Sequence, residues 1–356
     1  MSSTPHVLVV GAGIVGASAA WHLLRAGARV TVLEADAPGG LATRASFAWI
    51  NASVGNPYPY FRLRVRAMQE WHTLERELPG LAVRWIGSLY WELPPDERRR
   101  FVAEHASWGY DIHAVDRDDI LRLEPGLAAP PAVAAYAPTE GCVEPAAAAC
   151  ALLTDVERFG GKVITDTPAR SLAMQDGRIC GVETGTGRLA ADEVVVAAGV
   201  GAAPLLATAG VTLPLLHRPG VQITTRPHTT LLNGMIMTPG AAIRQSVDGR
   251  VIAVTSIDNG ADGPAAALAL LEVVQRMFAS GEALVLERHV IGYRPMPQDE
   301  LPVIGRVDAK PGLYVTVTHS GVTLAPVLGR FVAEEILSGR RDGLLAPYGF
   351  ERFGQG

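Results

Sequence analysis

The sequence predicts an α/β fold in two domains, one of them built on a parallel sheet. Three observations support this prediction. An apolar run over 6–10 leads through closely spaced glycines and a helix-like stretch into a second apolar run over 30–34. Another apolar run over 193–198 ends at Gly199, as a buried central strand does where a parallel sheet meets a ligand. The chain has 356 residues, which is long enough for about two domains.

The first 34 residues predict a Rossmann-like βαβ unit that binds a dinucleotide. Gly11 permits a tight turn after the strand, Gly13 lets the backbone approach a pyrophosphate, and Gly16 lets helix and sheet pack closely. The helix N-terminus offers free N–H groups and a positive dipole end to phosphates. Glu34 ends the second strand, where its carboxylate accepts hydrogen bonds from ribose hydroxyls and disfavours a 2′-phosphate. A plain α/β turn without a ligand is the alternative.

Composition and charge argue against several functional classes. Hydrophobic residues make up 48% of the chain and charged residues 19%, as in soluble globular proteins. The formal net charge is −5 without a block of like charges, which argues against nucleic acid as a partner. The apolar run at the N-terminus is too short for a membrane span and lacks a basic leader. We therefore expect a cytoplasmic protein without a targeting segment, and we leave homo-oligomerisation open.

The cysteines indicate neither a metal site nor a disulfide framework. Cys142, Cys150 and Cys180 lack metal-ligand and CxxC spacing, and their number is odd. We expect all three to be buried small hydrophobic residues in a reducing cytoplasm, and we expect no bound metal.

Apolar periodicity predicts the remaining helices and strands. Met68 and Trp71 recur at helical spacing, and we expect both in the core rather than in a site. A loop is expected over 125–138. Helices are expected over 60–78, 96–108, 145–159, 263–279 and 327–337. Strands are expected within 81–93, at 162–165, at 178–182, over 193–198 and in alternating runs over 213–254.

Two further stretches combine small residues with a helix start. The glycine-rich loop 37–51 has side chains small enough for a flat ring system to approach its backbone, and Thr43 or Ser46 can cap a following helix. A surface loop is the alternative. In the C-terminal third, a strand ends at Thr318-His-Ser-Gly321 and a helix follows, which directs free N–H groups toward an electron-rich group. The chain therefore has two such helix N-termini, near residues 13 and 322.

Taken together, the motifs resemble the D-amino-acid-oxidase superfamily of FAD enzymes, which includes glycine oxidase, sarcosine oxidase and D-amino-acid dehydrogenases. The resemblance runs in order over nearly the whole chain, and glycine oxidase is the most similar familiar member. The motifs are the glycine pattern with Ala20, Leu23, Gly27 and Glu34, then Thr43-Arg-Ala-Ser46, Val143-Glu-Pro145, Val194-Val-Val-Ala-Ala-Gly199, Gly292-Tyr-Arg-Pro295, Asp299-Glu-Leu-Pro-Val-Ile-Gly-Arg306 and His319-Ser-Gly-Val-Thr-Leu-Ala-Pro326.

The resemblance implies an FAD-binding domain of the Rossmann-like, glutathione-reductase type and a second, mixed-sheet substrate domain. The isoalloxazine is expected between them. The implied FAD-binding domain is discontinuous and covers 1–79, 141–213 and 298–356, and the implied substrate-binding domain covers 80–140 and 214–297.

The resemblance also implies which residues bind FAD. Sarcosine oxidases carry a flavin-linking cysteine near the position of Arg294, whereas this chain has Met296 and Pro297, so we expect non-covalent FAD. The N–H groups at the start of the C-terminal helix are expected at the pyrimidine carbonyl, where negative charge accumulates on reduction. By position, the expected cofactor-binding residues are Gly11, Gly13, Ile14, Val15, Gly16, Glu34, Ala35, Thr43, Arg44, Ala45, Ser46, Ala48, Ala169, Ala198, Gly199, Arg294, Ser320, Gly321, Val322, Thr323 and Leu324.

The resemblance implies that Arg294 binds the substrate. Its planar guanidinium can make two parallel bonds to a carboxylate and so direct the substrate Cα–H toward flavin N5, with a structural ion pair as the alternative. His319 is expected to polarise the amine or the flavin, with packing or hydrogen bonding as the alternative. Tyr293 is a third catalytic candidate. The remaining substrate-pocket candidates are Trp49, Asn51 and Arg244.

Two departures from the resemblance affect the substrate. Members similar to glycine oxidase often pair the carboxylate-binding arginine with a tyrosine on the strand before a turn such as 248–250, whereas this chain has Ala241-Ala-Ile243. The loop between His319 and Gly321 is also shorter than in glycine oxidase. Both changes enlarge or reshape the pocket, so we expect that it can accept a substrate bulkier than glycine.

The implied function is FAD-dependent oxidation of glycine, an N-substituted glycine or a D-amino acid. Hydride transfer from the carbon of the C–N bond to the flavin gives an imine, which water hydrolyses to an oxo acid and an amine. Oxygen takes up the electrons and yields hydrogen peroxide. The first alternative is a dehydrogenase of a D-amino or hydroxy acid that passes electrons to a carrier. The second, from another class, is a non-catalytic dinucleotide-binding protein.

Overall fold

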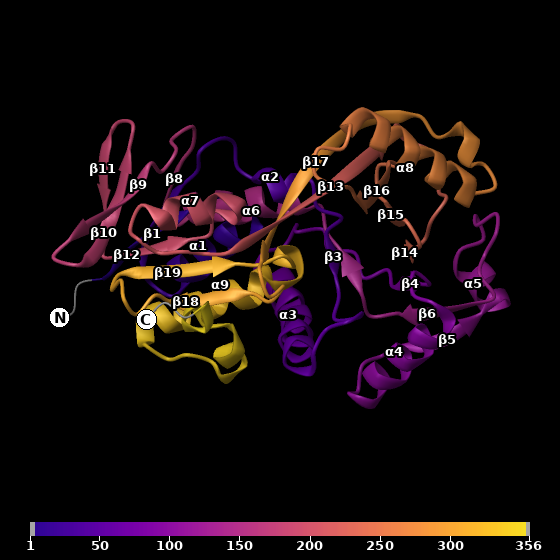
Figure 1. Cartoon of the computed structure of the whole chain (residues 1–356), viewed down its shortest axis with the longest axis horizontal. Coiled ribbons are helices and arrows are strands. Elements are labelled where there is room, and N and C mark those ends of the chain that lie inside the picture. The colour runs from indigo at the N-terminus through magenta and orange to yellow at the C-terminus, as the bar shows by residue number, and fades with distance from the viewer. Residues whose placement is uncertain (1–3, 354–356) are drawn as a thin grey trace.

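The computed structural model describes residues 4–353 as two regions, each built on its own β-sheet (Figure 1). The long strands β13 (Leu215–Thr225) and β17 (Leu286–Pro297) run between the two regions and pair with each other in antiparallel register. Helices and strands alternate in the first region, and antiparallel pairs dominate the second. The predicted α/β fold class is therefore confirmed, while the domain boundaries stay a prediction.

The first sheet has six strands in the described chain, in the order β18-β19-β12-β1-β2-β8. β1 lies in its middle, with β2 and β12 parallel to it on either side. Four of its five residues are buried, as expected for a strand covered on both faces. The strands are β1 (His6–Val10), β2 (Arg29–Leu33), β8 (Lys162–Ile164), β12 (Glu193–Val196), β18 (Val303–Arg306) and β19 (Leu313–Val317).

Helices α1 and α9 cross at close range on this sheet. A Cβ on Gly329 of α9 would lie 2.5 Å from Ser18 Oγ and from His22 Nδ1 of α1, so only glycine permits this approach. α3 packs against α9, where the buried Trp71 bonds to the α9 backbone, and Met68 and Trp71 belong to one buried cluster, which confirms both as core residues. The helices of this region are α1 (Ile14–Arg25), α2 (Leu41–Arg44), α3 (Tyr58–Glu77), α6 (Pro145–Arg158), α7 (Ala202–Ala207) and α9 (Gly321–Ser338).

The C-terminal helix begins at Gly321, six residues before the predicted start. The prediction was wrong because Pro326 lies inside the helix without breaking it. Proline has no N–H for the carbonyl four residues earlier, which belongs to Val322. The buried indole of Trp71 supplies the missing donor, because its Nε1 donates to Val322 O at 3.0 Å.

The second sheet has eight strands in the described chain, in the order β17-β13-β16-β15-β14-β4-β6-β5. α8 (Gly263–Met277) covers one face, and its N-cap Asp262 accepts a hydrogen bond from Ala265 N. The prediction of strands within 81–93 is confirmed in part, since β4 forms there and belongs to this sheet, whereas the prediction of a loop over 125–138 was wrong, because β6 forms within it. The other strands and helices are β4 (Ser88–Tyr90), β5 (His113–Asp116), β6 (Val133–Ala137), β14 (Met235–Thr238), β15 (Ala241–Gln245), β16 (Val251–Ser256), α4 (Pro95–Ser107) and α5 (Arg117–Leu123).

Two smaller sheets and four 3₁₀ turns complete residues 4–353. Of the three cysteines, Cys142 is buried, but Cys180 is half-buried and Cys150 is exposed, so the prediction that all are buried was wrong. Within the same range, no helix is long and apolar enough to cross a membrane. The remaining elements are β3 (Trp49–Ile50), β7 (Gly141–Cys142), β9 (Ser171–Gln175), β10 (Arg178–Thr184), β11 (Gly187–Ala190), and 3₁₀ turns at Gly199–Gly201, Gly281–Ala283, Gly343–Tyr348 and Phe350–Phe353.

Candidate active site

The glycine turn after β1 fits tightly against β12. Gly11 has φ +107°, and a Cβ on it would lie 2.6 Å from Ala197 O. A Cβ on Gly16 would overlap the carbonyl oxygen of Gly11. The predicted roles of Gly11 in the turn and Gly16 in close packing are thus matched by the backbone geometry.

The start of α1 offers N–H groups, but one of them is already used. No side chain caps the helix at Gly13, whereas the N–H of Ile14 donates to Thr43 Oγ1 at 3.1 Å. The amides of Val15 and Gly16 in the first turn face the region in front of the helix. Glu34 points toward the same turn, because its Oε2 accepts from Ala12 N at 2.7 Å. This arrangement fits the pyrophosphate and ribose of a dinucleotide.

The start of α9 lies against the start of α1. A Cβ on Gly321 would lie 3.1 Å from Val15 Cγ2, so the two helix N-termini meet. Ser320 is the N-cap of α9, and its side chain does not cap the helix. Thr323 Oγ1 donates to Trp49 O at 2.8 Å and so fixes β3 beside this helix start. The two predicted helix N-termini are therefore adjacent in space.

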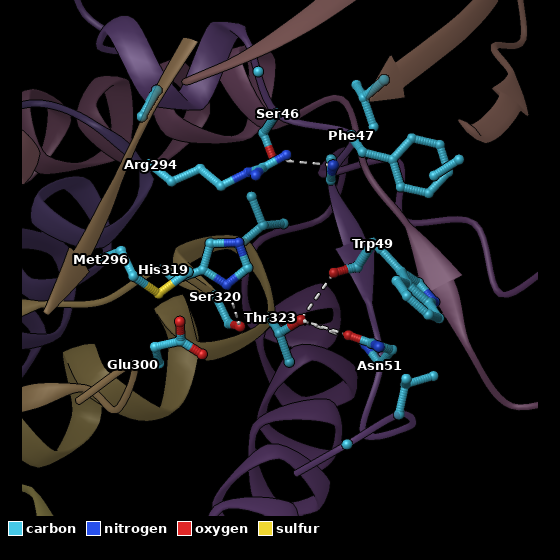
Figure 2. Close-up of a pocket in the computed structure, with 18 of the residues that line it drawn as sticks. Ser46, Phe47, Trp49, Asn51, Arg294, Met296, Glu300, His319, Ser320 and Thr323 are labelled. Atoms are coloured by element: carbon cyan, nitrogen blue, oxygen red, sulfur yellow. Dashed lines mark hydrogen bonds between the residues drawn. The ribbon is translucent and has the colours of Figure 1, made fainter. Parts of the chain in front are cut away.

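A cavity of about 720 Å³ opens beside the start of α9, between the two regions (Figure 2). Its volume is within the range of small-molecule sites. The loop 42–49, the second sheet and the α9 start all contribute. Ala48 lines it with φ 64°, a conformation uncommon for a residue with a side chain. The predicted residues that line it are Ala45, Ser46, Ala48, Trp49, Asn51, Tyr293, Arg294, His319, Ser320, Val322 and Thr323.

Arg294 reaches into this cavity from β17 (Figure 2). Its Nη1 donates to Ser256 Oγ at 2.9 Å, and it forms no ion pair with an acidic residue in the range 4–353. Burial and the neighbouring Arg218 lower the pKa of Arg294 from its usual value, because both disfavour the charged form. A half-buried cation without an acidic partner can receive an anionic ligand.

His319 lies in the middle of the same space (Figure 2). The protein atoms around its ring, followed by Arg294 and Arg64, lower the pKa of His319 to about 4. The ring contacts solvent within the cavity. At neutral pH the imidazole is uncharged and can accept or donate one hydrogen bond. Tyr293 lies at the rim, 43% exposed, with its ring 4.8 Å from that of His217.

Sequence reasoning missed Arg64, a buried cation that lines the cavity from α3. Its Nε donates to Asn51 O at 3.1 Å, its Nη2 donates to Asn51 Oδ1, and its Nη1 donates to Ser320 Oγ at 2.5 Å. One signal was available, because Arg64 falls three residues after Phe61 and four before Met68 in an apolar helical stripe. A charge in such a stripe is uncommon without a partner.

Arg244 does not line the cavity, contrary to the prediction. It is 1% exposed, its Nε donates to Phe47 O at 2.8 Å, and its Nη1 pairs with Glu144 Oε1 at 2.5 Å. The alternative of a structural ion pair, considered above for Arg294, applies to Arg244 instead. Trp49 does line the cavity, although its indole Nε1 donates away to Glu140 Oε2 at 2.7 Å.

The other predicted cofactor residues lie outside the cavity wall. Arg44 is exposed and its Nη2 donates to Pro38 O at 2.8 Å, so its side chain is directed away from the cavity. Ala169 lies in the loop before β9, while Ala198 and Gly199 follow the carboxyl end of β12. The remaining predicted cofactor-binding residues lie at the ends of β1 and β2 or in the first turns of helices, and they are Gly11, Gly13, Ile14, Val15, Gly16, Glu34, Ala35, Thr43, Gly321 and Leu324.

Residues 4–353 contain no group of three or more His, Cys, Asp or Glu side chains placed to hold a metal ion. The adjacent helix starts, the glycine turn and the cavity instead fit one extended anionic cofactor with a flat ring. The backbone N–H groups would hold its phosphates and its carbonyl edge.

Comparisons with known proteins agree with the resemblance of the sequence motifs to a family of FAD enzymes. A model of the FAD dependent oxidoreductase family matches residues 6–335. An uncharacterized oxidoreductase YurR of Bacillus subtilis is 28% identical over 96% of this chain and 97% of its own length. A glycine oxidase of Pseudomonas aeruginosa is 26% identical over the same shares. The crystal structure of glycine oxidase from Geobacillus kaustophilus matches with a TM-score of 0.88 and 24% identity, and covers 98% of this chain and 99% of that one.

Proposed function

The chain belongs to the FAD-dependent oxidoreductase family, and from that premise we propose that it oxidises the C–N bond of an amino acid. FAD is the cofactor of the family, and we propose that it binds here without a covalent link. In support, Met296 lies at the cavity where a linking cysteine would be needed, and none of the three cysteines lines the cavity. The proposed substrates are glycine, an N-substituted glycine or a D-amino acid.

One observation supports this choice above the others, namely the unpaired guanidinium of Arg294 in the cavity. A carboxylate is the ligand that fits its planar pair of donors. Bound there, the carboxylate fixes the substrate so that the Cα–H has one orientation relative to the cofactor. Amino acids, N-alkylglycines and hydroxy acids all carry this carboxylate, so the amine is the part that the experiment must identify.

The remaining cavity residues position and shield the substrate. Met237, Ala242 and Val254 form an apolar floor on the second sheet, which excludes water from the reacting carbon. His319 is uncharged at neutral pH and can accept a hydrogen bond from an N–H of the substrate amine, which orients the nitrogen lone pair relative to the reacting carbon. FAD, when bound, would supply the hydride acceptor.

The direct test is anaerobic reduction of the FAD-loaded protein by a panel of glycine, N-alkylglycines, D-amino acids and hydroxy acids. We expect at least one amine to bleach the flavin absorbance. Air is then admitted, and formation of hydrogen peroxide at the turnover rate identifies an oxidase. Slow reoxidation that an artificial electron acceptor accelerates identifies a dehydrogenase.

Arg294→Met is the matching variant. We expect it to lower the efficiency of reduction about 100-fold, the size of effect seen when a buried partner of a carboxylate is removed. Arg250→Met removes an arginine from exposed ion pairs with Asp248 and Glu287, and should leave reduction unchanged. Bleaching by hydroxy acids alone, with every amine inactive, would overturn the proposed function.

A further inference from the structure

The cavity carries two guanidinium groups without an acidic partner, those of Arg294 and Arg64. We propose that the substrate is an amine bearing two carboxylates, with one bound at Arg294 and the second at Arg64. This inference rests on the proposed function, since it assigns the substrate class of the same site. It adds a second anion subsite on α3.

Hydrogen bonds fix the Arg64 guanidinium in place, but they use only some of its N–H donors. It is 6% exposed, and its guanidinium lies 5.3 Å from the ring centroid of Tyr60. A guanidinium has five N–H donors, and Asn51 and Ser320 receive three of them. The other two, one on each Nη, are available to a ligand in the cavity that Arg64 lines. A second carboxylate would satisfy both.

The acidic residues around the cavity do not neutralise these two cations, because each has its own partner. Asp299 pairs with Arg352 at 2.6 Å, and Glu300 pairs with Arg218 at 3.4 Å. Glu92 accepts a hydrogen bond from the Tyr90 hydroxyl, and burial raises its pKa.

Glu140 lies behind the cavity wall and is also engaged. Its oxygens accept from Trp49 Nε1 at 2.7 Å, from Tyr110 at 2.6 Å and from Ser88 at 2.5 Å. Burial raises its pKa, which reduces its value as a counter-charge. Arg64 and Arg294 therefore lack an acidic partner within residues 4–353, and an uncompensated buried cation is costly unless an anion joins it.

His319 connects the two cationic positions. Its Nδ1 lies 3.5 Å from Ser320 Oγ, which in turn accepts from Arg64. Arg294 and Arg64 both lower the pKa of His319, so both guanidinium groups act on the same ring. A substrate whose amine lies beside His319 would thus have one cation toward each end.

The test compares two amines that differ only in the second carboxylate. N-(carboxymethyl)glycine has it, and N-ethylglycine has a methyl group in its place. In anaerobic reduction of the FAD-loaded enzyme, we expect the dicarboxylate to be favoured at least tenfold in the ratio of reduction rate to dissociation constant. Arg64→Met should reduce that preference to about one, mainly by raising the dissociation constant of the dicarboxylate, and Arg250→Met should leave it unchanged.

Arg64→Lys keeps the charge and covers the case in which Arg64→Met does not fold. It should retain an intermediate preference, since ammonium binds a carboxylate without the planar pair of donors. Equal efficiency of the two amines with wild-type enzyme overturns the inference. So does an Arg64→Met variant that slows both amines alike and shifts the flavin midpoint potential, because Arg64 would then serve the cofactor.

Failure of the proposed function itself has a different signature. In that case neither amine reduces the flavin, while a hydroxy acid does. Both the proposed oxidation of an amine and the proposed dicarboxylic substrate are then wrong. If N-ethylglycine reduces the flavin without any disadvantage, the amine chemistry stands and only the second anion subsite is rejected.

Discussion

The starts of α1 and α9 are adjacent in space but are built in different ways. At α1, glycines set the geometry through the backbone alone, since a Cβ on Gly16 would overlap the oxygen of Gly11. At α9, side chains from distant segments do the same work: Trp71 donates to Val322 O, and Arg64 donates to Ser320 Oγ. A site built on backbone contacts can be recognised from its sequence spacing, whereas one built on long-range side-chain contacts cannot.

The largest effect should follow from placing a side chain where the backbone of Gly16 in α1 contacts the backbone of Gly11. Gly16→Ala places a Cβ against Gly11, and we expect it to lower the free energy of unfolding by about 3 kcal/mol and to release FAD. Gly13→Ala is the matched control for stability, because its Cβ would meet only Thr43 Oγ1, at 3.2 Å. Urea unfolding and retained flavin measure both effects. Equal stability of the two variants would show that the backbone contact does not determine this region.

The next effect concerns the crossing of α1 and α9, where His22 is buried and its Nδ1 contacts Ser18 O at 2.9 Å. Burial lowers the pKa of His22 to about 4 from its unfolded value of 6.5. Between these pH values the unfolded chain binds more protons, so stability is complete above pH 6.5 and falls toward pH 4. We expect a loss of about 2 to 3 kcal/mol over this window.

His22→Gln should flatten that part of the pH profile of urea unfolding, while His113→Gln, which replaces an exposed histidine, should leave the slope unchanged. A His22→Gln profile as steep as that of the wild type would assign the acid sensitivity to other groups.

A smaller effect is expected from removing the donor at α9. Trp71→Phe leaves the buried Val322 carbonyl without a partner and should cost about 2 kcal/mol. Pro326→Ala restores a backbone N–H four residues after Val322, so Trp71→Phe should cost less in that background. Denaturant unfolding of the four proteins in this cycle gives the coupling energy. A coupling energy near zero would mean that the indole does not replace the missing backbone donor.

The smallest effect should come from the side-chain cap at α1. Thr43→Val removes the acceptor of the Ile14 N–H and should cost about 1 kcal/mol. Thr43→Ser keeps the hydroxyl and should be close to wild type in thermal unfolding. If valine and serine behave alike, the hydroxyl contributes no cap.

Much of the fold was predictable because it depends on local spacing. The βαβ unit, the apolar strand before Gly199 and the helix around Trp71 all follow from periodicity. The start of α9 was predicted too late in the chain because Pro326 was expected to precede the helix. The helix accommodates Pro326 because Trp71, 255 residues earlier in the sequence, donates to the carbonyl that the proline leaves without a backbone donor. For the same reason, Arg244 was expected in the cavity, although its partner Glu144 holds it behind the wall.

The candidate site was predictable in part. The residues contributed by the sequence motifs, such as Ser46, Arg294 and His319, do line one cavity. Arg64 was missed because its neighbours in the sequence are those of an ordinary amphipathic helix, and its contacts with Asn51 and Ser320 exist only in the folded chain.

The measurement that tests the central claim most directly is a crystal structure of the chain with FAD. The account predicts one FAD molecule with its pyrophosphate at the amides of Val15 and Gly16 and its pyrimidine carbonyl at the amides of Ser320 to Thr323. It also predicts that the guanidinium of Arg294 faces the flavin ring across the cavity. An isoalloxazine bound away from the start of α9, or an Arg294 side chain turned out of the cavity, would contradict it.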